Sequence, residues 1–292
     1  MWILFFVKIG FKEKTNIGFK PKPRCKVLLI ICPLYFFNFS LKPILTKNRI
    51  HILNTFIDNL SMQETLQVIQ KSIASKTQLH HVVVNAGKLV AMQKDQQLRE
   101  SVNSSNLINA DGQAVVWASK VLKKPLKQRV AGIDLMHNLV AMAHQKKQKI
   151  YLLGAKQQVV EKVANTYANQ YSQELVAGYR NGYFSPQQEA QIATDIAQSG
   201  AQLLFVAISS PMKENFLYKH RGILKGVHFI MGVGGSFDVV AGLTKRAPLW
   251  MQNAGLEWFY RFAQEPKRMW KRYLVGNTAF IYLVVKEKFK KA

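Results

Sequence analysis

Asp111 is the residue in this sequence whose type and position best suit acid–base chemistry. It follows the short apolar run LINA and opens the stretch DGQAVVWAS. A carboxylate at the end of a strand can act as a general base that takes the proton from an attacking hydroxyl group, provided that the two are within hydrogen-bond reach. An aspartate in this position can instead cap the helix that follows, and the sequence leaves both interpretations open.

Two further stretches are suited to binding a phosphate or diphosphate group. Arg129 stands in RVAGID, before a predicted helix, where its planar guanidinium group can grip a phosphate or pair with a surface carboxylate. The turn Gly232-Val233-Gly234-Gly235 offers backbone N–H groups that no side chain obstructs. Its spacing differs from the dinucleotide fingerprint, so it predicts a diphosphate site, or only a tight turn with positive φ, but no nicotinamide site.

The sequence has no recognisable metal motif. Its seven histidines do not form the i, i+4 pair plus third ligand typical of zinc sites, and no Asp-x-Asp motif is present to hold a divalent ion on a nucleotide diphosphate. We therefore expect a reaction that needs no metal or other cofactor, in which arginine, lysine or helix N-termini stabilise a departing diphosphate. The two cysteines, Cys25 and Cys32, match no zinc or redox motif.

The candidate residues stand in a chain that alternates short apolar strands with amphipathic helices from about residue 50 onward. We expect strands at 81–84, 107–109, 149–153, 202–208 and 227–233, and helices at 61–75, 88–102, 113–122, 132–145, 157–170, 186–199 and 212–224. This order predicts an α/β fold with a Rossmann-like, mostly parallel sheet that helices cover on both faces. The stretch GYRNGY, residues 178–183, is interpreted as a turn.

Small or polar residues follow each of the expected strands. Asn85 follows HVVV, Asp111 follows LINA, Gly154 follows IYLL, and residues 209–211 and 232–238 follow the last two strands. Because the carboxyl ends of parallel strands meet at one edge of a sheet, and ligands bind beyond that edge, we expect these residues to line one site.

The charge of the chain is concentrated at its two ends. The sequence has 41 Lys and Arg against 16 Asp and Glu, a formal net charge of +25. Residues 1–49 contain ten basic residues and one acidic residue, and residues 245–292 contain eleven basic and three acidic residues. Aromatic residues accompany these charges, which is typical of contact with an anionic membrane surface. Nucleic-acid binding would rest on charge alone, since no motif for it is present.

The sequence therefore divides into three parts: a basic and apolar extension over 1–48, an α/β core over 49–244, and a basic, aromatic helical appendage over 245–292. The apolar run 27–41 of the extension contains Pro33, is too short to span a membrane and does not fit a secretory signal. The extension is either a segment that touches the membrane or the product of a start codon assigned too early.

The appendage combines many aromatic residues with basic residues. Pro266 suits the first turn of a helix, so we expect two short helices that join near Glu265. They either lie at the headgroup depth of a membrane or pack on their own domain. Their apolar surface also makes a homo-oligomer plausible.

Seven stretches resemble, in order and spacing, the WecG/TagA/CpsF glycosyltransferases: NADGQAVVWASK, RVAGIDL, GYRNGYF, SSPMKE, GVGGSFDVVAG, KRAP and GLEWFYRFAQEPKR. The resemblance covers about residues 50–275. It implies an inverting enzyme that moves N-acetylmannosamine, or its uronic acid, from a UDP-sugar to a polyprenyl-diphosphate-linked amino sugar. The reaction would need no metal and would take place on the cytoplasmic face of the membrane, in the synthesis of a cell-surface polysaccharide such as a capsule or an exopolysaccharide.

The resemblance also implies roles for single residues. Asp111 matches the proposed general base, Asn85 the asparagine of a Thr-x-Asn motif, and Arg129 an active-site arginine that helps to hold the phosphates. The implied substrate-binding residues are Lys213, Glu214, Gly232, Gly234, Gly235, Asp238, Arg246, Arg261, Arg268 and Arg272. Val83 departs from the usual threonine and Lys213 from a common glutamine, and these two departures leave the donor sugar open.

A second interpretation keeps the site but not the reaction. A membrane-associated protein that binds a nucleotide-sugar or a lipid diphosphate without reacting it would need the glycine turn and the basic appendage. It would tolerate the loss of Asp111.

Overall fold

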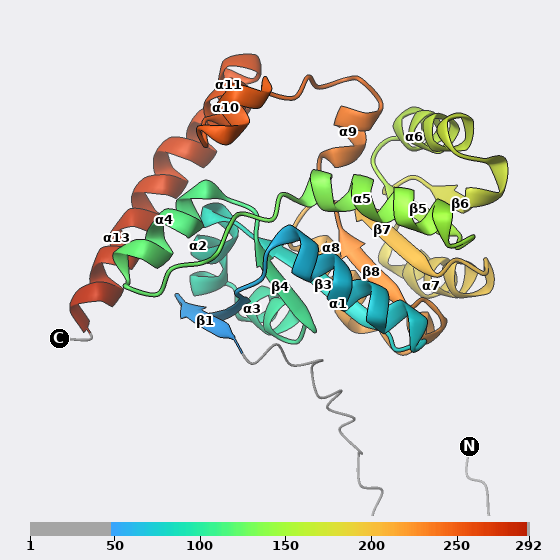
Figure 1. Ribbon diagram of the computed structural model, residues 1–292, viewed down its shortest axis with the longest axis horizontal. Coiled ribbons are helices and arrows are strands. Elements are labelled where there is room, and N and C mark those ends of the chain that lie inside the picture. Colours follow the sequence, from blue (N-terminus) through green and yellow to red (C-terminus); the bar gives the residue numbers. More distant parts are fainter. Residues whose placement is uncertain (1–47, 291–292) are drawn as a thin grey trace, which may run out of the picture. The chain divides into compact units, whose positions relative to one another are not determined.

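A six-stranded parallel sheet lies at the centre of the fold (Figure 1). The computed structural model describes residues 48–290, apart from the side chains of Arg268, Lys271 and Arg272. The strand order is β4-β3-β8-β7-β5-β6, and every neighbouring pair is parallel, as the sequence predicted. The strands are β3 (Leu79–Val84), β4 (Leu107–Ala110), β5 (Ile150–Gly154), β6 (Val176–Arg180), β7 (Leu203–Ala207) and β8 (Phe229–Gly232).

Helices cover both faces of this sheet, which is why its strands are apolar on both sides. Alternate strand residues such as Leu152 and Phe205 pack on one face against α1 (Met62–Ala74), α5 (Gly132–Gln145), α6 (Gln157–Gln170) and α9 (Ser236–Val240). On the other face, α7 (Glu189–Gln198) and α8 (Met212–His220) pack against β5, β7 and β8. The same face of β3 and β4 is covered by α2 (Ala86–Lys94), α3 (Gln96–Asn103) and α4 (Gln113–Val121). The expected α/β architecture is confirmed.

A small antiparallel hairpin precedes the sheet and was not predicted. It consists of β1 (Arg49–Ile52) and β2 (Thr55–Asp58), joined by two residues with positive φ. The buried carboxylate of Asp58 accepts hydrogen bonds from Arg49 Nε at 2.8 Å and from the backbone N–H of Ile108 at 2.8 Å. These bonds fasten the hairpin to β4.

The structure corrects two of the predicted elements. The single helix expected over 88–102 is two helices, α2 and α3, because Asp95 ends the first and its side chain caps the second by accepting from Leu98 N. The stretch GYRNGY is only partly a turn, since its first three residues belong to the edge strand β6. A strand with glycine and an exposed tyrosine lacks the apolar pattern that marks the central strands.

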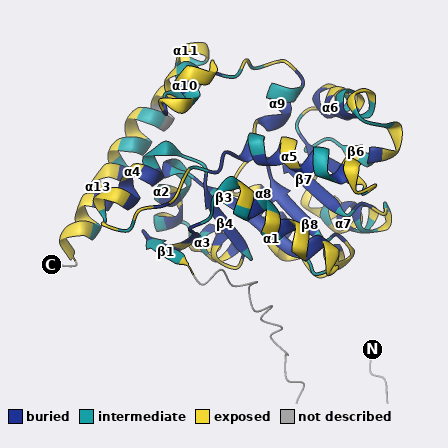
Figure 2. Ribbon diagram, viewed as in Figure 1, coloured by how far each residue is buried: buried dark blue, intermediate teal, exposed yellow. Residues whose placement is uncertain are grey.

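The C-terminal part is helical, with the expected break at Glu265 and Pro266 at the start of the next helix. Its helices are α10 (Leu249–Asn253), α11 (Glu257–Gln264), α12 (Pro266–Trp270) and α13 (Gly276–Lys290), with a π-helical turn at Lys271–Val275 between the last two. Phe280 and Val284 of α13 are buried in the apolar cluster that contains residues of α2 and α4. Most other residues of α13 are exposed (Figure 2). The predictions for residues 1–47 lie outside the described residues.

Candidate active site

Asn85 and Asp111 lie side by side at the carboxyl edge of the sheet. The backbone N–H of Asp111 donates to the carbonyl of Val84, the residue before Asn85, at 2.9 Å. A Cβ atom placed at Gly112 would lie 3.3 Å from Cβ of Asn85, so glycine allows this close approach. The Asn85 side chain caps α2 by accepting from the backbone N–H of Lys88 at 3.0 Å. The sequence predicted that both residues lie at this edge, and the pairing of β3 with β4 places them next to each other.

The Asp111 carboxylate points to the N-terminus of α5. Its Oδ1 accepts a hydrogen bond from Gly132 N at 3.2 Å. Gly112, not Asp111, is the N-cap residue of the following helix α4, so the capping interpretation of Asp111 is wrong. The carboxylate is therefore held by a different helix, α5.

Burial raises the pKa of Asp111 to about 6, although three neighbours oppose the increase. The positive charges of Arg129 and Arg261 and the Gly132 N–H favour the carboxylate, whereas the negative charge of Glu257 favours the acid. A general base works best when its pKa lies near the working pH. At neutral pH this carboxylate is mostly ionised and is still a better proton acceptor than an ordinary aspartate.

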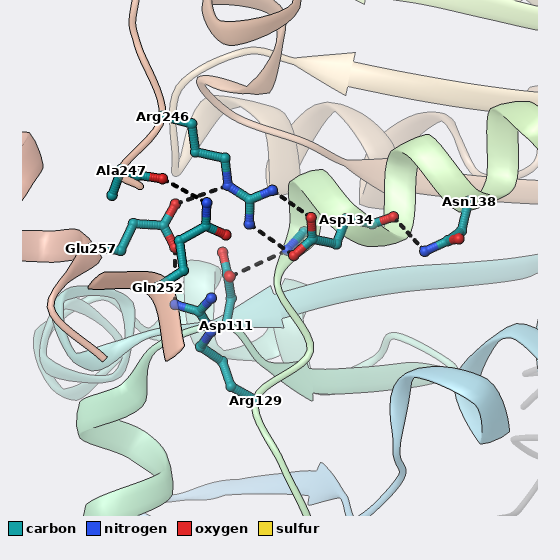
Figure 3. A network of polar contacts seen from close by, with 9 residues as sticks. Asp111, Arg129, Asp134, Asn138, Arg246, Ala247, Gln252 and Glu257 are labelled. Atoms are coloured by element: carbon teal, nitrogen blue, oxygen red, sulfur yellow. Dashed lines mark hydrogen bonds and ion pairs between the residues drawn. The ribbon is translucent and has the colours of Figure 1, made fainter. Parts of the chain in front are cut away.

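A chain of ion pairs lies next to Asp111 (Figure 3). Glu257 of α11 accepts from Arg129 Nη1 at 3.0 Å through one oxygen and from Arg246 Nε at 3.3 Å through the other. Arg246 also binds both carboxylate oxygens of Asp134, with Nη2 at 2.8 Å from Oδ2. The chain joins the loop before α5, the first turn of α5, the segment before α10 and the start of α11.

Arg261 of α11 reaches the glycine turn that follows β8. A Cβ atom placed at Gly235 would lie 3.4 Å from Nη2 of Arg261 and 3.8 Å from Oδ2 of Asp238. Gly234 has a φ of 53°, which favours glycine, and open space surrounds it. Gly234 and Gly235 are exposed, and the Arg261 guanidinium group lies close to Gly235. A cation beside an exposed glycine turn is a combination suited to binding a phosphate group.

Lys213 and Glu214 form a buried charge cluster with Lys88. Glu214 Oε1 accepts from Lys88 Nζ at 2.8 Å and from Lys213 Nζ at 3.2 Å, and all three side chains are less than a tenth exposed. Burial and the charge of Lys88 lower the pKa of Lys213 to about 8. Burial alone would raise the pKa of Glu214, but the two lysines lower it to about 2. The Lys213 side chain lies across Gly232, where a Cβ atom would come within 2.6 Å of its Cδ.

The structure thus brings most of the predicted site residues to one edge of the sheet. Asn85 and Asp111 lie side by side, and Arg129 and Arg246 share Glu257 close to Asp111. Arg261 reaches the glycine turn, and Lys213 and Glu214 are buried behind Gly232. Val83, which replaces the threonine of the Thr-x-Asn motif, lies close to Gly132. Its Cγ2 is 3.9 Å from a Cβ atom placed at that glycine. The side chains of Arg268 and Arg272 lie outside the described residues.

Sequence reasoning missed Lys88, Glu257 and Gly132. Lys88 stands three residues after Asn85 at the start of a predicted helix, and that place could have drawn attention to it. Glu257 is an acidic residue in a basic segment, which marks it as a partner for an arginine. Within residues 48–290, as far as their side chains are described, no group of three or more His, Cys, Asp and Glu side chains could hold a metal ion.

Comparison with known proteins identifies the family of this chain. The model of the glycosyl transferase WecG/TagA/CpsF family matches residues 50–292. A Bacillus subtilis (strain 168) protein, N-acetylglucosaminyldiphosphoundecaprenol N-acetyl-beta-D-mannosaminyltransferase, is 36% identical over 239 residues, which cover 82% of this chain and 89% of the relative. The family model matches nearly the whole described structure, and together with this relative it shows that the chain belongs to the WecG/TagA/CpsF glycosyltransferases.

Proposed function

We propose that this glycosyltransferase moves an N-acetylmannosamine-type sugar from a UDP-sugar to a polyprenyl-diphosphate-linked amino sugar, with inversion at the anomeric carbon. The similar Bacillus subtilis protein carries the corresponding sugar and acceptor in its name. The observation that carries the proposal is the meeting of Asp111, the arginines and the glycine turn at one edge of the sheet. A carboxylate poised as a base beside a diphosphate-binding surface is what such a transfer needs.

In the proposed reaction, Asp111 accepts the proton of the acceptor hydroxyl group. The hydroxyl oxygen forms a bond to the anomeric carbon of the donor as the bond from that carbon to the diphosphate oxygen breaks. One displacement from the side opposite to the leaving group inverts the anomeric configuration. The proton ends on Asp111, and UDP leaves with the electron pair of the broken bond.

The negative charge that develops on the leaving diphosphate requires preorganised donors. In this proposal the exposed glycines Gly234 and Gly235 supply N–H groups, and buried Gly232 begins the turn. The charged donors are Arg129, Arg246 and Arg261. Asn85 lies beside the base and orients either the donor sugar or the acceptor hydroxyl group. Lys213 and Glu214 support the glycine turn from behind, and Asp238 lies at its far end.

We also propose that the two parts of the chain differ in their main substrate. The core, residues 49–244, holds most of the UDP-sugar, with Arg246 and Arg261 of the appendage on its diphosphate. The appendage, residues 245–292, holds the lipid acceptor at the cytoplasmic face of the membrane. Exposed aromatic residues support this, since Trp250 is 66% exposed and Trp270 52%. Among the described residues, none of the helices is both long and apolar enough to cross a bilayer. The association would therefore be peripheral.

The substitution Asp111→Asn tests the reaction. It preserves the shape of the side chain but removes the base, so we expect kcat to fall by about 10²–10⁴-fold. Transfer from UDP-N-acetylmannosamine to a polyprenyl-diphosphate-GlcNAc acceptor would be followed by product mass, and circular dichroism would check the fold. Asp195→Asn, at an exposed carboxylate of α7, is the control. Undiminished turnover by Asp111→Asn would remove Asp111 as the base.

A further inference from the structure

We infer that Glu257 is a positioning residue for the transfer reaction, through which the C-terminal helices set both the arginines and the base of the site. The inference rests on the proposed function of Asp111 and the arginines. The sequence did not single out this residue, and its role follows from its contacts.

Glu257 is shared by two arginines that come from different parts of the chain. Arg129 belongs to the loop before α5, and Arg246 precedes α10, yet each donates to a different oxygen of the same carboxylate. The three side chains are 17%, 22% and 28% exposed for Arg129, Arg246 and Glu257, respectively. At such partly shielded positions, charge-assisted hydrogen bonds hold a guanidinium group more firmly than exposed ion pairs do. One carboxylate therefore fixes the distance between two of the proposed diphosphate ligands.

Glu257 also orients a third arginine through the geometry of α11. Arg261 follows Glu257 by four residues, so the two side chains leave the same face of the helix one turn apart. This places Arg261 over Gly235 while Glu257 engages Arg129 and Arg246. Movement of α11 that broke the Glu257 contacts would displace Arg261 from the glycine turn.

The charge of Glu257 acts on the base as well. The groups that set the ionisation of Asp111 are Arg129 and the Gly132 N–H, both near the start of α5, and Glu257 and Arg261 on α11. Of these, Glu257 raises the pKa of Asp111, and the other three lower it. Loss of the Glu257 charge removes the increase and also leaves the charge of Arg129 uncompensated. Both changes lower the pKa of Asp111 and make it a weaker base.

The experiment compares Glu257→Gln with Asp134→Asn. Both variants remove one carboxylate charge that contacts Arg246, but only Glu257 also contacts Arg129 and acts on Asp111. For Glu257→Gln we expect kcat/KM at its plateau to fall by about 10–100-fold, as misplacement of reacting groups does. We also expect the acid limb of its pH profile to move to lower pH. Asp134→Asn should lose activity without moving that limb.

A second readout needs no transfer activity. The titration of the Asp111 carboxyl carbon, followed by ¹³C nuclear magnetic resonance and assigned with Asp111→Asn, should give a lower pKa in Glu257→Gln than in the wild type. Glu257→Asp, which keeps the charge with a shorter reach, should titrate close to the wild type but transfer sugar more slowly. If Glu257→Gln does not fold, the Glu257→Asp variant still tests the inference through its rate of sugar transfer.

Two results would overturn the inference. One is an Asp111 pKa that is as high in Glu257→Gln as in the wild type. The other is an equal shift in Asp134→Asn, which would make the effect one of general charge. Either result leaves the proposed reaction intact, since that reaction fails only if Asp111→Asn retains full turnover or if the wild type transfers no sugar to the lipid-linked acceptor.

Discussion

The α/β core and the C-terminal helices differ in how far many of their aromatic side chains are buried. In the core, Phe205 and Phe229 are completely buried between the sheet and its helices. In the C-terminal helices, Trp250 and Trp270 are more than half exposed, and α13 turns most of its residues to solvent (Figure 2). The core aromatics stabilise the fold by packing. Exposed tryptophans contribute little to stability, so their place in the sequence is better explained by contact with another surface.

The two regions meet along α13 and at the candidate site. Phe280 and Val284 anchor α13 in the apolar cluster around α2, and Glu257 connects α11 to Arg129 of the core. The core contains Asp111, the proposed base, and the helices contain Arg261 and the carboxylate that pairs with Arg129. The proposed site therefore needs residues of both regions.

The largest expected effect tests the contrast between buried and exposed aromatics. Phe205→Ala removes a buried ring from the centre of the sheet and should lower the free energy of unfolding by about 3–5 kcal/mol. Trp250→Ala, at an exposed position, should change it by less than about 0.5 kcal/mol. Chemical denaturation at pH 7.5 measures both values. Similar losses for the two variants would mean that the C-terminal helices are packed like the core.

The second expected effect concerns the site where the regions meet. The folded pKa of Asp111, about 6, exceeds the ordinary value of 3.8, so ionisation of Asp111 opposes folding. This cost is absent below about pH 4, grows between pH 4 and 6, and is complete above pH 6. Asp111→Asn should therefore raise the free energy of unfolding above pH 6 by up to about 3 kcal/mol. Denaturation at pH 4 and pH 7.5 measures it, and an increase of equal size at both values would contradict the assignment.

The smallest expected effect tests what the exposed helices contact. Replacement of Arg268 and Arg272 by Glu should weaken binding to anionic liposomes by at least about 2 kcal/mol, since each basic residue near the surface contributes about 1 kcal/mol. Flotation of the protein with vesicles measures this, and turnover should fall more on long-chain acceptors than on soluble analogues. The control is Lys146→Glu with Lys147→Glu, which makes the same charge change at exposed positions after α5. Equal losses in both pairs would argue against a membrane-binding face on the appendage.

The central part of the fold could be predicted from the sequence because its strands are continuous apolar runs followed by small or polar residues. The order of strands could not, since neighbours such as β8 and β3 are far apart in the chain. The hairpin and β6 were missed because they are partly exposed and lack the continuous apolar runs of the central strands. The break between α2 and α3 depends on one capping aspartate within a continuous helical pattern.

The site was predictable where it follows strand ends and less so where distant segments meet. Asn85, Asp111 and the glycine turn follow neighbouring strands of a parallel sheet, so their proximity follows from topology. The pairing of Arg129 and Arg246 with Glu257 depends on how α11 lies on the core, which no local pattern encodes. The burial of Lys213 was not foreseen either, because the charge cluster around Glu214 includes Lys88, which comes from another helix.

The contact between Lys213 and Gly232 limits how these two positions can change during evolution. An alanine at 232 would force the methylene chain of Lys213 aside, because its Cδ lies only 2.6 Å from the place of the new methyl group, and Lys213 is tied to Glu214. A shorter residue at 213 would remove this clash. The effect of a substitution at 232 should therefore depend on which residue stands at 213.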